Sequence, residues 1–530
     1  MVASGHPYAS LAGLDVLKDG GNAFDAVVAI AATLNAVEPY MSGIGGVGVA
    51  LLYVASEGRT RVLDFSGRTA AGAVPGAYTQ QTKTTGPRAA LVPGNVAGWT
   101  TLHDTYGSLP LKRCFRDALD CAANGFPLTP FAADMLRANW SVLTSSATVH
   151  ESFLQNATEP PRPGALLKQP DLARSLSAIA EGGAKNFYEG EIAEKLVRSV
   201  ETAGGLIDAA DLGSYKARWQ EPLSGTYGGY EVRVPPPNSS GFQILETLNI
   251  LSDDAPLEYG SVESVHLMLE AVKLAIEDRL SYAGDPDFVD IPIERLLGSE
   301  HARALRSRIH LGQTGRLPAE RFTGEGVAAR SERTRKAEPW WRDGLTTHFA
   351  AADSEGNIAT VTQTLGNTFG SRFMPEDTGI FLNNMCLWFD IDPAIQTPNL
   401  VGPRKRVDFC LAPCQVFKDG KPRLSLGTPG SYGILQTTVQ MLHAVIDTGM
   451  NIQEAIEAPR FRLMETGVQN FERRFPQSFL DALNARGHET TRLPQGWSRV
   501  VGGAHGIQVT EHGTYLGGAD PRRDGIAVGF

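Results

Sequence analysis

The sequence is poor in cysteine, and its few thiols follow no pattern. The 530-residue chain has five cysteines, an odd number at scattered spacing. A disulfide framework needs an even, regularly spaced set, so we expect free thiols and a reducing compartment. Cys410 and Cys414 come nearest to a metal-binding pair, but no second pair and no histidine stands beside them, which argues against a zinc site. The five are Cys114, Cys121, Cys386, Cys410 and Cys414.

The chain also lacks an excess of positive charge and a long apolar run. Its formal net charge is −10, and no basic run is longer than residues 404–406 (RKR). The most apolar early run, residues 23–37, contains Asp25 and Asn35 and is too short to span a bilayer. The first residues show neither the basic start nor the apolar core of a signal peptide. We therefore expect no nucleic-acid or membrane partner and a cytoplasmic location, with the earlier removal of a leader left open.

Several common catalytic motifs are absent. The sequence has no G-x-S-x-G elbow, no Walker loop and no H-E-x-x-H, and its 11 histidines show no metal-ligand spacing. Residues 43–48 (GIGGVG) fit the dinucleotide pattern, which requires a strand before the glycines and a helix after them. Here a helix-like run precedes them and the strand-like residues 49–54 follow. This reversed order predicts a tight turn rather than a nucleotide site. Because the histidines also show no metal-ligand spacing, we expect neither a metal nor an organic cofactor.

Helix-like and strand-like segments follow one another without an evident linker. Residues 10–34 have helical spacing, broken at residues 20–22 (GGN), and residues 264–282 form the clearest amphipathic pattern. Short strand-like runs dominate from Thr346 onward, until a further helical pattern at residues 435–448. This order predicts layered α and β structure.

The segment that starts at Thr346 is the strongest candidate for chemistry. It reads as a strand, a tight turn at residues 353–357 (DSEGN) and a second strand that ends at residues 362–365. If the bond before Thr346 is cut, one residue carries a hydroxyl nucleophile and an α-amine whose ordinary pKa of about 7.7–8.0 suits a base. Threonine pairs are also common in strands for conformational reasons alone. Support comes from residues 310–343, whose Arg, Glu, Gly and Pro content predicts an exposed loop before Thr346.

Eight short motifs stand in one order along almost the whole chain. They are residues 20–26 (GGNAFDA), 39–46 (PYMSGIGG), 92–98 (VPGNVAG), 284–288 (GDPDF), 346–348 (TTH), 379–384 (GIFLNN), 427–430 (GTPG) and 520–525 (DPRRDG). Together they resemble the γ-glutamyltranspeptidase family of N-terminal-nucleophile hydrolases. The resemblance implies an α+β fold, a four-layer αββα sandwich, and self-cleavage between Leu345 and Thr346. It also implies a large subunit (1–345) and a small subunit (346–530), intertwined in one globular unit, with a homodimer of these left open.

The resemblance assigns catalytic roles by position. Thr346 corresponds to the nucleophile, and Thr364 to the threonine that hydrogen-bonds the nucleophile's amino group or hydroxyl. Gly430 and Ser431 correspond to a Gly-Gly pair whose backbone N–H groups form the oxyanion hole. Ser431 departs from the family pattern, but the donor is the backbone amide, so we expect the function to survive. One such donor contributes roughly 3–4 kcal/mol of transition-state stabilisation.

The residues with which the family holds a γ-glutamyl group are mostly missing. The family uses an arginine, two adjacent serines, an asparagine and a Gln…Asp set to bind the α-carboxylate and α-amine. Burying either charge without a partner costs roughly 3–5 kcal/mol, so we expect a standard γ-glutamyl donor to bind poorly. The residues at these positions are Ser66 for the arginine, Phe409 and Cys410 for the serines, Gly366 for the asparagine, and Met385 and Trp388 for Gln and Asp.

The substrate site that remains is expected to be mostly apolar. Residues 66–68 (SGR) and 383–389 (NNMCLWF) resemble a branch of amide hydrolases whose relatives include oxamate amidohydrolases and cephalosporin-type acylases. Arg68 is the candidate ligand of a substrate carboxylate, with a structural salt bridge as an equal alternative. The expected substrate-binding residues are Arg68, Asn367, Met385, Trp388 and Cys410.

These features predict a self-processing amide hydrolase or acyl transferase. Thr346 attacks the carbonyl of a small-molecule amide or acyl-amino substrate, and water, rather than an amine acceptor, releases the acyl group. Oxamate-type and cephalosporin-type acyl amides are the alternative substrates. A different class stays open as well, namely an uncleaved and catalytically silent family member that binds a ligand or partner.

Overall fold

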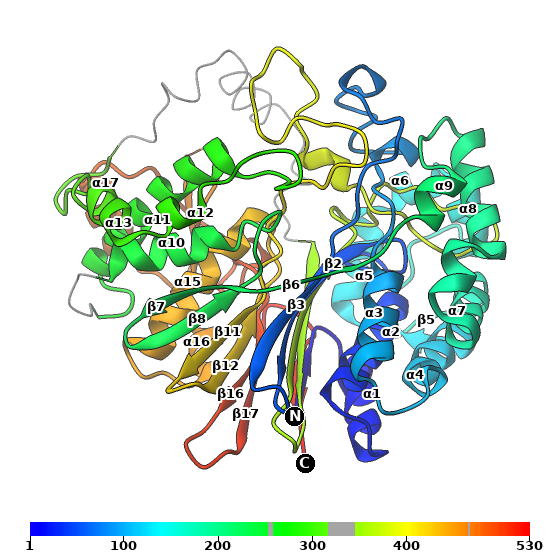
Figure 1. Ribbon diagram of the computed structural model, residues 1–530, viewed down its shortest axis with the longest axis horizontal. Helices are drawn as coiled ribbons and strands as arrows, with labels where there is room; N and C mark the ends of the chain where they lie inside the picture. Colours follow the sequence, from blue (N-terminus) through cyan, green and yellow to red (C-terminus); the bar gives the residue numbers. More distant parts are fainter. Residues whose placement is uncertain (253–257, 316–344, 465–466) are drawn as a thin grey trace.

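Two antiparallel β-sheets face each other, and helices cover the outer side of each (Figure 1). The computed structural model describes residues 1–252, 258–315, 345–464 and 467–530. The layers follow the order helix, sheet, sheet, helix, as the αββα prediction requires. The greater part of residues 310–343, predicted to form a loop, lies outside the described residues.

The first sheet has the strand that begins at Thr346 near its middle. That strand, β9, lies between β1 and β10 and pairs with both in antiparallel register. Ladder hydrogen bonds therefore hold it on two sides. The strand order is β18 (Ile526–Val528), β1 (Val2–Ser4), β9 (Thr346–Ala352), β10 (Ile358–Thr364), β2 (Val47–Val54), β3 (Arg59–Phe65) and β6 (Arg218–Gln220).

The second sheet packs against the first through apolar residues and a few polar bridges. Gln415 Nε2 donates to Ile358 O at 3.1 Å and to Thr360 Oγ1 at 3.0 Å, and Thr360 Oγ1 lies 2.7 Å from Ser425 Oγ. These buried groups are satisfied by one another, as groups between two sheets must be. The strand order is β17 (Tyr515–Ala519), β16 (His505–Val509), β12 (Lys421–Gly427), β11 (Cys414–Lys418), β8 (Tyr230–Val234) and β7 (Leu223–Tyr227).

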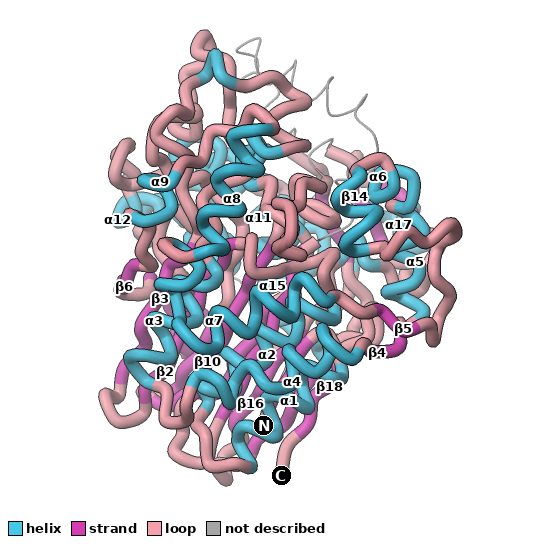
Figure 2. The backbone as a smooth tube through the Cα atoms, turned by 90° about the vertical axis from the view of Figure 1, so that its right-hand side faces the viewer, coloured by secondary structure: helices cyan, strands magenta, loops and turns pink. Residues whose placement is uncertain are grey.

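The outer helices divide into two groups, and Figure 2 shows one of them lying across the first sheet. This first group contains α1 (Pro7–Lys18), α2 (Ala23–Val37), α3 (Asn95–Tyr106), α4 (Leu111–Asn124), α7 (Pro170–Tyr188) and α8 (Glu191–Thr202). On the other side lie α10 (Phe242–Leu251), α11 (Val262–Tyr282), α12 (Ile293–Leu296), α13 (Ser299–Arg306), α15 (Ile434–Ile446), α16 (Ile452–Glu457) and α17 (Gln477–Ala485).

The predicted break between the first two helices is confirmed, and its cause is local. Gly20 has φ +89°, a conformation that glycine adopts readily and that ends α1. Asn22 then caps α2, because its side chain accepts hydrogen bonds from the N–H groups of Phe24 and Asp25. Asp25 accepts in return from Asn22 N, which completes a capping box. All fifteen residues of α2 are buried.

The predicted hairpin is confirmed as β9 and β10, joined by residues 353–357. Asp353 organises the turn, because its Oδ1 accepts from Glu355 N and Asn357 N at 3.0 Å each. Its Oδ2 accepts from Ala23 N at 2.9 Å, at the start of α2. The turn is therefore tied to the positive end of a buried helix, which favours a carboxylate there.

Two other sequence expectations meet different outcomes. The glycine run does follow a helix, and its last two residues begin β2. A Cβ on Gly46 would come within 2.5 Å of Thr364 O, so close packing explains the run. The helix over residues 264–282 is present as α11, but the prediction that it is amphipathic was wrong. Buried residues lie all round it, including Glu270 and Lys273, which pair at 2.6 Å.

All five cysteines are free and buried. Within the described ranges, none of the helices combines the length and the apolar character that crossing a membrane requires.

We expect Asn22→Ala to lower the free energy of unfolding by about 2 kcal/mol, because it removes the cap of α2 and a hydrogen bond from Asn22 Nδ2 to Tyr106 O at 2.6 Å. Asn451→Ala is the matched control. Asn451 forms the same capping box on α16 without such a cross-link, so we expect a loss of about 1 kcal/mol. Urea unfolding followed by circular dichroism measures both, and equal losses would contradict the cross-link.

Candidate active site

Thr346 lies directly opposite Thr364 across the β9–β10 hairpin. Thr346 Oγ1 donates to Thr364 Oγ1 at 3.3 Å, and Thr364 Oγ1 donates to Leu345 O at 2.9 Å. Gly366 N in turn donates to Thr364 Oγ1 at 2.8 Å. The chain is continuous across Leu345 and Thr346, so these contacts belong to the form before any cleavage. One hydroxyl therefore contacts both the predicted nucleophile and the carbonyl oxygen of the bond predicted to break.

Two charged side chains also hold the start of β9 in place. Arg523 Nη1 donates to Thr346 O at 3.1 Å, and Thr347 Oγ1 donates to Glu38 Oε2 at 3.0 Å. Both charged residues are buried. Burial raises the pKa of Glu38 to about 7, while the charge of Arg523 and the Thr347 hydroxyl oppose the rise. Sequence analysis gave neither residue a role, although Arg523 lies within the DPRRDG motif and Glu38 directly precedes PYMSGIGG.

A pocket opens beside Thr346. It brings together most of the residues to which the sequence assigned a catalytic or binding role. No side chain among its described lining residues is charged. The lining residues are Leu345, Thr346, Thr364, Gly366, Asn367, Met385, Trp388, Cys410, Leu411 and Ser431.

Gly430 and Ser431 form a sharp bend between β12 and α15. Their φ angles are +143° and +54°, in the region that favours glycine. Serine at this φ costs roughly 1–2 kcal/mol, which explains why a Gly-Gly pair suits the bend and why Ser431 is a departure. Neither backbone N–H donates a hydrogen bond to another residue in the described part of the chain. Both amides are therefore able to bind an oxygen of a ligand, although only Ser431 lines the pocket.

Gly366, which stands where the family has an asparagine, has a steric reason to lack a side chain. Its φ is +100°, and a Cβ there would come within 2.2 Å of Asn384 Oδ1. That oxygen accepts a hydrogen bond from Asn367 N at 2.9 Å, which fixes the loop. The side chain that the family uses for recognition therefore cannot be restored at residue 366 without moving Asn384.

The wall formed by Met385, Trp388 and Cys410 is buried or half-buried. Trp388 packs edge-to-face on Tyr432, with ring centroids 4.8 Å apart. Burial raises the pKa of the Cys410 thiol to about 12, and the neighbouring Asp408 adds to the rise. Cys410 therefore stays a neutral thiol near pH 7 and serves as part of an apolar wall rather than as a nucleophile.

Behind this wall lies a buried charged group that sequence analysis missed. Asp408 accepts from Tyr432 Oη at 2.9 Å, and its other oxygen accepts from Ser240 Oγ. Arg279 lies 3.6 Å from Asp408 and stacks 3.9 Å from the Tyr432 ring centroid. These charges are paired with each other and do not line the pocket, and no local spacing in the sequence joins residues 279 and 408.

Arg68 is the one predicted substrate-binding residue that the structure does not bring to the pocket. Its Nη2 donates to Ser214 Oγ at 2.7 Å instead. Gly67, next to it, donates from its backbone to Tyr215 Oη at 3.1 Å. Arg68 thus connects β3 to the segment before β6, and its predicted role as the ligand of a substrate carboxylate gains no support from this position.

Comparisons with known proteins agree with this architecture. The model of the family described as "Gamma-glutamyltranspeptidase" matches residues 9–530. The chain belongs to the γ-glutamyltranspeptidase family. It is therefore an enzyme of the N-terminal-nucleophile hydrolase class, an amide hydrolase or acyl transferase with an αββα fold, as the sequence predicted.

Two relatives and one solved structure illustrate the range of proteins that this chain resembles. The chain is 35% identical to the acylase ACY 1 proenzyme of Pseudomonas sp. (strain V22), with 100% of the chain and 93% of the relative covered. It is 34% identical to the glutathione hydrolase proenzyme of Bacillus subtilis (strain 168), with 100% and 91% covered. The crystal structure of cephalosporin acylase from Bacillus halodurans superposes with a TM-score of 0.89 at 30% identity, covering 99% of the chain and 94% of that structure.

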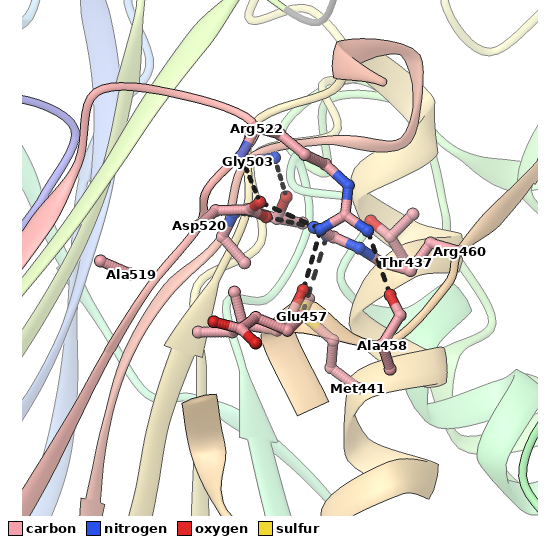
Figure 3. A network of polar contacts seen from close by, with 12 residues as sticks. Thr437, Met441, Glu457, Ala458, Arg460, Gly503, Ala519, Asp520 and Arg522 are labelled. Carbon is pink, nitrogen blue, oxygen red and sulfur yellow. Dashed lines mark hydrogen bonds and ion pairs between the residues drawn. The ribbon is translucent and has the colours of Figure 1, made fainter. Parts of the chain in front are cut away.

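In this γ-glutamyltranspeptidase-family chain, Asp520, Arg460 and Arg522 form a buried ion network (Figure 3). Asp520 pairs with Arg460 and, at 3.0 Å, with Arg522, and all three side chains are fully buried. Asp520 Oδ2 also accepts from Ala504 N at 2.8 Å. The adjoining Gly503 N donates to the side chain of Thr428 in the GTPG motif at 3.1 Å. The network therefore supports the segment on which the bend rests.

We expect Asp520→Asn to lower the free energy of unfolding by about 3–5 kcal/mol, because the buried guanidinium of Arg460 loses its carboxylate partner, whereas Arg522 keeps its ion pair with Glu472 at 2.7 Å. Asp134→Asn breaks an exposed ion pair with Arg137 and serves as the control, with an expected loss of about 1 kcal/mol or less. Urea unfolding at pH 7 measures both.

The loss of stability caused by Asp520→Asn should depend on pH. Burial alone would raise the pKa of Asp520, but Arg460 and Arg522 hold it well below its ordinary value. The contribution of Asp520 is thus fully present above its unfolded pKa of about 3.9 and is lost as pH falls toward the folded value. The difference between wild type and Asp520→Asn should shrink below about pH 4, and a difference that grows with acid would contradict the account.

Proposed function

We propose that this chain cleaves itself between Leu345 and Thr346, and that the new N-terminal Thr346 then hydrolyses small-molecule amides with an apolar acyl group. The contacts of the Thr364 hydroxyl with Thr346 Oγ1 and Leu345 O support the first part. The uncharged lining of the pocket beside Thr346 supports the proposed preference for an apolar acyl group. The proenzyme names of the acylase and glutathione hydrolase relatives also support a precursor that is cut into two subunits.

In the processing step, Thr346 Oγ attacks the carbonyl carbon of Leu345, and the peptide nitrogen of Thr346 leaves as an amine. The ester formed between Leu345 and Thr346 Oγ is then hydrolysed by water, which yields the Leu345 carboxylate and the free threonine. The Thr364 hydroxyl donates to the carbonyl oxygen that becomes negative in this attack. Because β9 is paired on both sides, the fragments 1–345 and 346–530 stay associated after cleavage.

In the mature enzyme the α-amine of Thr346 accepts the proton of its own Oγ as this oxygen attacks the substrate amide. The N–H groups of Gly430 and Ser431 hold the oxyanion, the amine product takes the proton and leaves, and an acyl ester on Thr346 remains. Water attacks this ester, so the products are a carboxylic acid and the regenerated hydroxyl. Each of these steps uses groups of the chain itself.

The choice of acyl group follows from the wall of the pocket. A γ-glutamyl donor brings an α-carboxylate and an α-ammonium, and leaving one of them buried without a partner costs roughly 3–5 kcal/mol. The same cost applies to the carboxylate of oxamate, because Arg68 does not line the pocket. Met385, Trp388 and Leu411 instead offer apolar contact. An apolar acyl amide is therefore favoured over both.

We expect the wild-type chain to give two bands on a denaturing gel, the smaller with the N-terminal sequence Thr-Thr-His-Phe. Thr346→Ala should run as one full-length band without activity, because it lacks the attacking hydroxyl. Thr346→Ser keeps a hydroxyl and is the matched control, with slower but complete cleavage. A single, intact wild-type band would instead favour the catalytically silent binding protein.

Substrate choice is tested with two 4-nitroanilides that share a leaving group and differ in the acyl part. We expect kcat/KM for the hexanoyl anilide to exceed that for the γ-glutamyl anilide by at least ~100-fold, which corresponds to the cost of an unpaired buried charge. Trp388→Ala should lower hexanoyl turnover and leave the γ-glutamyl rate nearly unchanged. Faster turnover of the γ-glutamyl anilide, or of oxamate, would overturn the proposed substrate class while leaving self-cleavage intact.

A further inference from the structure

Three groups of potential metal ligands are brought together by the described part of the chain, and none of them belongs to the active site. In each group the ligand atoms lie within 4.8 Å of one another. The groups are Asp25, His103 and Cys114; His266, Glu270 and His488; and Glu246, Asp278 and His301.

The first group is already satisfied by protein donors. The Asp25 carboxylate accepts from Asn22 N at 3.1 Å, from Ser108 N at 3.0 Å and from Ser108 Oγ at 2.7 Å. It acts as the partner of a helix cap. Binding a metal here would break these hydrogen bonds, so the geometry gives no reason to expect one.

The second group holds its own cation. Glu270 accepts from Lys273 Nζ at 2.6 Å and from Gly315 N at 2.7 Å. His266 Nδ1 lies 2.7 Å from His488 Nε2, so the two rings satisfy each other. The Lys273 ammonium neutralises the carboxylate and would repel a metal ion.

The third group differs, because in the described part of the chain no lysine and no backbone amide binds its buried carboxylate. Glu246 on α10 is fully buried, and neither of its carboxylate oxygens receives a hydrogen bond from any described residue. His301 Nε2 on α13 lies 3.4 Å from Glu246 Oε1 and 2.6 Å from Asp278 Oδ2 on α11. The side chains of Asp278 and His301 are 15% and 18% exposed, so the group can be reached from solvent.

Two neighbouring carboxylates in this setting need a positive charge. Glu246 is fully buried, and the carboxyl group of Asp278 lies beside it. Asp278, His301 and Arg295 are the titratable and charged groups that face Glu246 from α11, α13 and α12. A cation bound between the two carboxylates removes the repulsion.

We propose that Glu246, Asp278 and His301 bind one zinc ion. An imidazole with two carboxylates is a donor set that suits zinc, which takes nitrogen and oxygen ligands and completes its shell with water, whereas calcium and magnesium prefer oxygen alone. The ion joins three helices, α10, α11 and α13, that lie together outside the six-stranded sheet (Figure 1). None of the three residues lines the pocket at Thr346, so the ion is structural.

The test uses the full chain after dialysis against a chelator, titrated with ZnCl₂ in a calorimeter. We expect about one ion per chain, because the three side chains lie close enough together to bind a single ion. Zinc should also raise Tm in a concentration-dependent manner, since it binds the folded chain.

Glu246→Gln keeps the size of the side chain and should lose zinc affinity by at least ~100-fold. Without zinc it should be as stable as wild type or more so, because the variant removes a buried carboxylate. His301→Gln, at a partly exposed side chain, should show the same loss of zinc and is the second variant if the first does not fold. His488→Gln, in the second group, is the matched control and should bind zinc like wild type. The proposal is overturned if wild type binds no zinc, or if Glu246→Gln and His301→Gln bind it as tightly as wild type.

Discussion

The alignment of Thr346 with Thr364 across the β9–β10 hairpin is the contact on which the whole site depends. The register brings the Thr364 hydroxyl into contact with both Thr346 Oγ1 and the Leu345 carbonyl oxygen, at the start of a strand that is paired on both sides. Glu38 and Arg523 fix the same strand start from behind. A bond in this position is buried and firmly oriented, which is what a self-cleaving peptide requires before the new chain end can act.

Much of this could be predicted from sequence because the signals are local. The hairpin follows from two strand-like runs and the DSEGN turn, and the start of α2 follows from GGN. Arg68 shows the limit of local signals, because no residue close to it in the sequence indicates that Ser214 will accept its hydrogen bond. Likewise, the ion pair of Arg279 with Asp408 and the group of Glu246, Asp278 and His301 join elements far apart in the chain, so no spacing announces them. The helix α11 was found, but its polar residues suggested an exposed face, whereas they pair inside the protein.

The described pocket wall carries no charged side chain for two reasons. Other residues replace the polar groups of the family, and the nearest charged residues described are paired with each other. Gly366 cannot carry a side chain beside Asn384, and Met385, Trp388 and Cys410 stand where the family has polar groups. The nearest charges described behind Trp388, Asp408 and Arg279, are directed at each other and at Tyr432. Changing the substrate class would therefore require new polar groups on the wall itself, together with space for them.

The most direct measurement traps the acyl-enzyme. The mature protein is mixed briefly with hexanoyl 4-nitroanilide, quenched in acid and digested, and the peptides are analysed by mass spectrometry. The account predicts one hexanoyl ester, on the peptide that begins with Thr346 and on its side-chain oxygen. A hexanoyl group on Cys410 or Ser431, or turnover by a chain in which Leu345 and Thr346 are still joined, would contradict it.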